Sequence, residues 1–137
     1  MQWTKDLSVG VEEIDEQHRE LFSRINMLVA SIKSAQCKYT VGDTIKFLQE
    51  YALTHFGAEE IHMARAAYPG LKQHREQHAV FLDSLSQLKA LLREPRVPGS
   101  SYELSVLTNQ VVVDWILAHI MKMDMAFGRY LRAKAGT

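Results

Sequence analysis

The chain has 137 residues, and its 16 Lys and Arg side chains balance 16 Asp and Glu side chains, which gives a formal charge of zero. This length is typical of one domain, expected here over residues 1–137, and a hydrophobic fraction of 47% is enough for a core, which argues against intrinsic disorder. The neutral balance argues against nucleic-acid binding, and the single Cys37 excludes an intramolecular disulfide. The sequence shows neither a secretory signal nor a run of ~18 apolar residues that could span a membrane, so we expect a soluble, cytoplasmic protein.

The first dozen residues are expected to form a non-helical arm, since their apolar side chains (Trp3, Leu7, Val9 and Val11) show no helical spacing. After the arm, apolar residues recur at three- and four-residue steps, the spacing of a helix with one buried face. The predicted buried stripes are Ile14, Leu21, Ile25, Leu28 and Ile32; Ile45, Leu48 and Ala52; Phe81, Leu85, Leu88 and Leu92; and Leu104, Leu107, Val111, Trp115 and Ile116.

Polar connections separate these four stripes at residues 36–43, 68–70 and 94–101. All three prolines of the chain lie in the second and third of them, where they cannot interrupt a helix. Alternation at period two, which is typical of strands, is not sustained anywhere. Four helices of ~20–30 residues joined by short connections predict an all-α fold, an antiparallel up-down-up-down four-helix bundle with the arm laid on it.

The six histidines are the unusual feature of the composition, and each predicted helix carries at least one. His55 and Glu59 are four residues apart, and so are His74 and His78. In a helix this spacing places both members of a pair on nearly the same face, as two ligands of one metal require. Facing helices of a bundle are known to build metal sites in the core.

His18 and His119 are single histidines beside apolar stripes, and each could instead be a hydrogen-bonded core residue. Asp124 follows His119 by five residues, about 140° around an α-helix at ~100° per residue, so the spacing favours a solvated aspartate beside Lys122. A shared metal centre would satisfy five imidazoles on four helices together, whereas burying them without partners is costly. The sequence therefore predicts a metal centre, and the alternative is a metal-free bundle with satisfied core histidines.

Imidazole with carboxylate suits iron, zinc, copper or manganese, and five histidines with two carboxylates exceed a four-coordinate zinc site. A zinc-protease motif fails, since Arg75 stands where its general-base glutamate is required. The ferritin-like di-iron enzymes use two Glu-x-x-His motifs, and this chain has one match, Glu59 to His62. Two irons sharing carboxylates fit the donor count.

The sequence resembles the single-domain bacterial hemerythrins, the family of non-haem di-iron dioxygen carriers, over nearly its whole length. The segments that carry the resemblance are Trp3 with Leu7 to His18, His55 to Met63, Tyr68-Pro69, His74 to His78 with Phe81, and Trp115 to Asp124. All of them occur in the family's order and at its separations.

The resemblance implies a role for each motif residue. One iron would be coordinatively saturated and the other would keep an open position, with two carboxylates and an oxo or hydroxo group bridging them. The ligands implied are His74, His78 and His119 for the saturated iron, His18 and His55 for the second iron, and Glu59 and Asp124 as bridges. The residues implied around the open position are Leu21, Phe56, Trp115, Ile116 and Ile120.

His62 departs from the family, which usually has an aliphatic residue there. Lying seven residues after His55 and three after Glu59, it is expected near the ligand-bearing face. It either packs behind the ligands or at a hydrogen-bonded bundle edge, or it enters the dioxygen pocket or ligates iron and so alters affinity or autoxidation.

The function implied is reversible dioxygen binding without catalysis, for storage or for delivery to an oxygen-consuming enzyme. Two alternatives remain open: a di-iron redox enzyme of the peroxidase or nitric oxide reductase type, and an oxygen or redox sensor that acts through a separate partner. The neutral surface and the lack of an extra apolar stripe favour a monomer.

Overall fold

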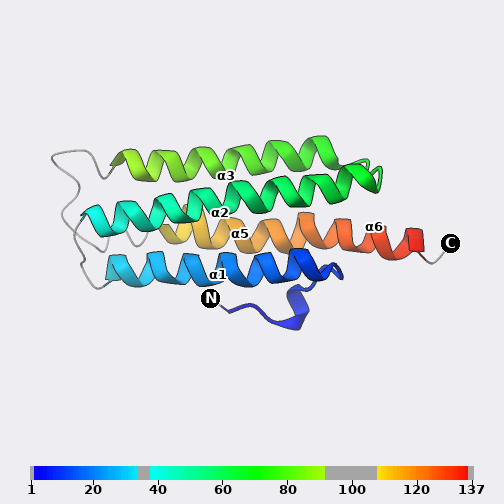
Figure 1. Ribbon diagram of the computed structural model, residues 1–137, viewed down its shortest axis with the longest axis horizontal. Helices are drawn as coiled ribbons and strands as arrows, with labels where there is room; N and C mark the ends of the chain where they lie inside the picture. Colours follow the sequence, from blue (N-terminus) through cyan, green and yellow to red (C-terminus); the bar gives the residue numbers. More distant parts are fainter. Residues whose placement is uncertain (1, 34–37, 92–107, 136–137) are drawn as a thin grey trace.

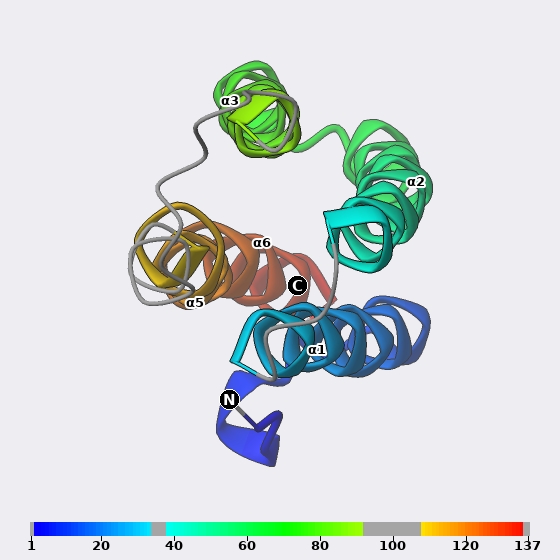
Figure 2. The ribbon, with the colours of Figure 1, turned by 90° about the vertical axis from the view of Figure 1, so that its left-hand side faces the viewer.

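The computed structural model describes residues 2–33, 38–91 and 108–135. The described helices form rods that lie side by side and alternate in direction, with the N-terminal arm beside the first (Figure 1). Seen along the bundle in Figure 2, the rods stand at four corners around a common interior. No strand occurs within the described ranges, so the predicted all-α four-helix bundle is confirmed. None of the described helices combines the length and apolar composition that crossing a bilayer needs.

The first three rods are single α-helices, and the fourth combines α-helical and π-helical segments. Their bounds are α1 Glu12–Lys33, α2 Lys38–Arg65 and α3 Leu71–Leu91, followed in the fourth rod by η2 Asn109–Val113, α5 Asp114–His119, η3 Ile120–Asp124 and α6 Met125–Ala135. Segments η2 and η3 are π-helical, with hydrogen bonds that reach one residue further than in an α-helix. Segment η3 ends at Asp124, one of the candidate metal ligands.

The predicted apolar stripes form the core of the bundle. A cluster of buried side chains extends between the rods and contains Leu21, Phe22, Ile25, Leu28, Ile32, Ile45, Leu48, Ala52, Phe56, Phe81, Leu85, Leu88, Val112, Ile116 and Ile120. Val111 and Trp115 pack against this cluster while keeping part of their surface exposed. Leu92, Leu104 and Leu107, also predicted for the stripes, lie outside the described residues.

The N-terminal arm packs along the bundle as predicted, but it contains one 3-10 turn, η1 (Lys5–Leu7). Its Val9 is buried in a second cluster with Ile14, Met63 and Phe127. The backbone N–H of Val9 donates a hydrogen bond to Asp15 Oδ1 at 2.9 Å, which ties the arm to the first turn of α1. The arm is therefore anchored to the bundle at the start of α1.

The connections differ in part from the sequence prediction. Helix α2 begins at Lys38, so the predicted connection at 36–43 is wrong over residues 38–43, where the helix has already started. The connection at 68–70 lies between α2 and α3 as expected, and the Tyr130 hydroxyl donates to the Ala66 carbonyl beside it at 2.8 Å. Cys37 and the connection at 94–101 lie outside the described residues.

Candidate metal centre

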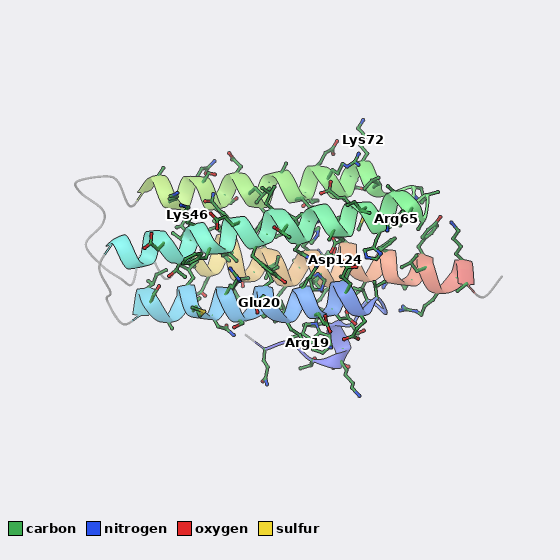
Figure 3. The ribbon with its side chains drawn as sticks, viewed as in Figure 1. Arg19, Glu20, Lys46, Arg65, Lys72 and Asp124 are labelled. Carbon is green, nitrogen blue, oxygen red and sulfur yellow. The ribbon has the colours of Figure 1, made fainter. Side chains whose placement is uncertain are left out.

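All seven residues that the sequence implies as ligands come together in the interior of the bundle. They are His18 from α1, His55 and Glu59 from α2, His74 and His78 from α3, His119 from α5 and Asp124 from η3, and each is at most 4% exposed. Figure 3 shows Asp124 inside the bundle, whereas Lys72 extends outward from α3. Every rod thus contributes at least one residue.

The seven residues form two overlapping groups, and within each group the donor atoms lie within 4.8 Å of one another. The groups are Glu59, His74, His78, His119 and Asp124 on one side, and His18, His55, Glu59 and Asp124 on the other. Glu59 and Asp124 belong to both. The arrangement therefore offers two adjacent cation positions, one with three histidines and one with two.

Glu59 divides its two oxygens between the groups. Its Oε1 atom lies 2.6 Å from His74 Nε2 and 3.1 Å from His78 Nε2. Its Oε2 atom lies 3.2 Å from His55 Nε2 and 3.5 Å from His18 Nε2. This carboxylate can thus present one oxygen to each cation position.

Asp124 divides its oxygens in the same way. Its Oδ1 atom lies 2.8 Å from His74 Nε2 and 3.1 Å from His119 Nε2, whereas its Oδ2 atom lies 3.1 Å from His18 Nε2. All five imidazoles therefore point their Nε2 atoms toward the two carboxylates.

The π-helical segment η3 explains why Asp124 is here and not in solvent. Spacing at α-helical period places it about 140° from His119, at ~100° per residue, and predicts a solvated side chain. The structure overturns that prediction, since Asp124 is 1% exposed. Hydrogen bonds in a π-helix join residues five apart, as the Met125 N–H bond to the Ile120 carbonyl does at the end of η3. The widened turn brings a residue five positions after His119 back to the same side of the helix.

Two histidines also have a hydrogen-bond partner for Nδ1, the ring nitrogen that faces away from the centre. The sequence did not predict these partners. His55 Nδ1 lies 2.8 Å from the Gln17 side-chain oxygen, and His78 Nδ1 lies 2.8 Å from Glu60 Oε2. Each partner comes from a neighbouring helix, so no periodicity links it to the histidine. The only local signals are that Gln17 precedes His18 and that Glu60 follows Glu59.

The ionisation of the cluster reflects the close packing of imidazoles and carboxylates. Burial alone lowers the pKa of His18 and of His74. Their contacts with Asp124 and Glu59 outweigh burial and raise both pKa values to about 9. For His119, burial also acts downward, and the same carboxylates again outweigh it and raise the pKa.

The carboxylates shift in the opposite sense. Burial raises the pKa of Glu59, but its histidine partners outweigh burial and hold that pKa well below the ordinary range. For Asp124, burial and repulsion from Glu59 are outweighed by His119 and His18, and the pKa is lowered. Both acids are therefore anions, and positive charge must balance them.

The residues fit a bound metal. Several buried atoms that face the centre have no well-aligned hydrogen-bond partner among the described residues: His18 Nε2, Glu59 Oε2 and both Asp124 oxygens. Leaving such atoms unsatisfied in a dry interior is costly, whereas coordination to a cation compensates them. Imidazole with carboxylate is a donor set for iron, zinc, copper or manganese.

The five apolar residues implied around the open position belong to the core of the bundle or pack against it, and two of them, Phe56 and Trp115, contact candidate ligands. Leu21, Phe56, Ile116 and Ile120 are buried, and Trp115 is partly buried against them. The Phe56 ring stacks on His78 with centroids 3.8 Å apart, and the Trp115 ring stacks on His119 at 4.7 Å. Each of these two imidazoles therefore has an aromatic ring packed flat against one face.

His62 lies at a hydrogen-bonded edge of the bundle, which is one of the alternatives expected from the sequence. Its Nε2 atom lies 2.8 Å from Glu13 Oε2, its side chain is 30% exposed, and it belongs to neither group of candidate ligands. The pair links α1 to α2 at the surface. Nothing in this geometry brings His62 into the centre.

The fold and the site together define a helical-bundle protein with a histidine- and carboxylate-lined metal centre. The sequence matches the Hemerythrin HHE cation binding domain over residues 9–131, and the chain belongs to the hemerythrin family. The resemblance drawn from the sequence motifs is thereby confirmed.

Individual relatives match this chain over most of their length. The chain is 30% identical over 131 residues to a bacteriohemerythrin of Stenotrophomonas maltophilia, covering 96% of this chain and 81% of the relative. It is 28% identical over 134 residues to a bacteriohemerythrin of Methylococcus capsulatus, covering 97% and 98%. A hemerythrin-like protein of Naegleria gruberi is 29% identical over 125 residues, covering 91% and 88%.

Proposed function

We propose that this protein binds dioxygen reversibly at a non-haem di-iron centre and serves to store oxygen or to deliver it to an oxygen-consuming enzyme. The observation that carries the proposal is the division of the Glu59 and Asp124 oxygens between two histidine groups. Two carboxylates shared in this way suit a pair of cations better than a single one. An oxo or hydroxo group from solvent would complete the bridge.

The three-histidine group would hold the saturated iron, and the two-histidine group would hold the iron with an open position. The assigned ligands are His74, His78 and His119 for the first, His18 and His55 for the second, and Glu59 and Asp124 as bridges. Two ferrous ions held by these residues would supply the two electrons that reversible dioxygen binding uses. Five neutral donors with only two anions make the centre less anionic than carboxylate-rich di-iron sites, which disfavours higher iron oxidation states.

The protein's apolar side chains would favour release of oxygen intact. Phe56 is buried against His78, Ile116 and Ile120 are buried in the same apolar core, and these side chains would restrict the access of water to the centre. A dry surrounding slows loss of reduced oxygen as hydroperoxide, the route to irreversible oxidation. Binding without transformation therefore suits these residues better than turnover.

The test is metal analysis combined with absorption spectra of protein loaded with ferrous iron under anaerobic conditions. We expect two irons per chain and a charge-transfer band that forms in air and disappears on deoxygenation. Asp124→Asn should lose iron and the band. Asp114→Asn, the same change at an exposed position of the same rod, should keep both.

Irreversible bleaching with consumption of peroxide would contradict a carrier and favour the peroxidase alternative. Fewer than two irons per chain would contradict the di-iron centre itself. Light scattering on the same preparation checks the expected monomer. The cytoplasmic location and the oxygen-consuming partner belong to this proposal and are tested by fractionation and co-purification from the source cells.

A further inference from the structure

Among the described residues, only two of the five imidazoles in the centre have a hydrogen-bond partner for Nδ1, the ring nitrogen that faces away from the centre. In the described part of the chain, the Nδ1 atoms of His18, His74 and His119 have none. His55 and His78 are the exceptions, and one of them belongs to each cation position. Each position therefore contains one anchored imidazole.

The anchor of His78 is a carboxylate that is itself held in place. Glu60 Oε2 receives the Nδ1–H of His78 at 2.8 Å, while its Oε1 accepts from Arg75 Nε at 3.1 Å. Because a carboxylate can only accept, the ring proton lies on Nδ1 and the Nε2 lone pair faces the centre. Arg75 and His78 lie on α3 and Glu60 on α2, so the contact spans the two helices.

A second contact restricts the same ring. Phe56 stacks on His78 with an angle of 6° between the planes, and it lies four residues before Glu60 on α2. One face of α2 thus presents a flat ring to the face of the imidazole and a carboxylate to its edge. His78 can neither tilt nor rotate without losing one of these contacts.

The anchor of His55 is neutral. The Gln17 amide oxygen accepts the Nδ1–H at 2.8 Å, which selects the same tautomer without adding a charge. The two cation positions therefore differ in the charge of their anchors as well as in their number of histidines. An anionic acceptor makes an imidazole a stronger donor than a neutral one does.

We propose that Glu60 and Gln17 are positioning residues that make the two metal positions unequal, with Glu60 strengthening the three-histidine position through His78 and Gln17 supporting the two-histidine position through His55. The inference rests on the proposed two-metal centre and deepens it. It assigns roles to two residues that donate nothing to the metals themselves. Partners of this kind change metal affinity by ~10–100-fold when removed.

The test uses cobalt(II) as the probe, titrated into the metal-free full chain and followed by its visible absorption and by competition with a chelator. The wild type should take up two equivalents with resolved dissociation constants. Glu60→Ala should weaken one equivalent by about 10–100-fold, and Glu60→Gln, which keeps an acceptor of the same shape, should weaken it less. Gln17→Ala should weaken the other equivalent.

Two further variants separate positioning from general structural damage. Glu76→Gln removes the same charge from an exposed position of α3 and should leave both dissociation constants within about two-fold of wild type. The exchange Gln17→Glu with Glu60→Gln moves the anionic anchor to the other histidine and should narrow or invert the difference between the two constants. In urea, metal-free Glu60→Gln should unfold with the same free energy as metal-free wild type.

The proposal would be overturned if Glu60→Ala and Gln17→Ala weakened the binding of the same cobalt ion. It would also be overturned if either variant changed the dissociation constants no more than Glu76→Gln does. Equal weakening of both equivalents by Glu60→Ala would indicate structural damage and would also overturn it. A wild type that binds fewer than two cobalt ions would instead refute the two-metal centre, and the inference would fall with it.

Discussion

Gly128 lies directly against the backbone of Val9 in the N-terminal arm, and replacing it should loosen that arm. A Cβ atom on Gly128 would lie 2.4 Å from the Val9 carbonyl oxygen and 3.1 Å from its carbonyl carbon. Both are backbone atoms, which cannot rotate away as a side chain can. Ordinary contact begins at 3.4 Å, so the arm must move by about 1 Å or detach.

The cost follows from what Val9 contributes. Crowding in a packed region costs ~1–3 kcal/mol. Complete release of the arm would expose a Val side chain, worth ~1.5–3 kcal/mol, and break its hydrogen bond to Asp15, worth ~1 kcal/mol. Alanine gains ~1 kcal/mol over glycine inside a helix, which offsets part of the loss. We expect Gly128→Ala to lower the free energy of unfolding by about 1–3 kcal/mol.

Gly57 is the matched control, because it lies within α2 and a Cβ atom added to it would meet no neighbouring side chain or helix within 4 Å. Gly57→Ala should raise the free energy of unfolding by ~0.5–1 kcal/mol. Urea unfolding followed by circular dichroism, at one metal loading for all variants, measures both changes. This prediction would be refuted if Gly128→Ala were as stable as wild type. It would also be refuted if both substitutions changed the free energy of unfolding in the same direction.

Three further predictions concern the centre. Since the pKa values of His18 and His74 stand at about 9 against an ordinary 6.5, their stabilisation of the metal-free fold is complete below pH 6.5 and is lost as pH rises through about 9. Thermal unfolding should show the metal-free protein losing stability over that range, and an unchanged Tm would contradict the charge pattern. His62→Leu should leave oxygen dissociation and autoxidation rates within about two-fold of wild type and cost at most ~1 kcal/mol, because only its partly exposed pair with Glu13 is lost. Phe56→Ala should cost ~3–5 kcal/mol in unfolding experiments and accelerate autoxidation, since it opens a cavity against His78; slower or unchanged oxidation would argue against its role in excluding water.

The helices and most of the candidate ligands could be predicted from the sequence, because an α-helix repeats locally. Apolar steps of three and four residues predicted the stripes that are buried here, and the pairs His55 with Glu59 and His74 with His78 follow from the same period. Those pairs needed no knowledge of how the helices pack. The family motifs added the order in which the pairs occur.

The remaining features depend on contacts between segments or on a local change of helix type. Asp124 reaches the centre because η3 is π-helical, and a calculation at α-helical period places it in solvent. Gln17 and Glu60 meet His55 and His78 only after neighbouring helices have packed, and His62 meets Glu13 across the bundle edge. Periodicity describes one helix at a time, whereas the partners of a side chain are set by the helices around it.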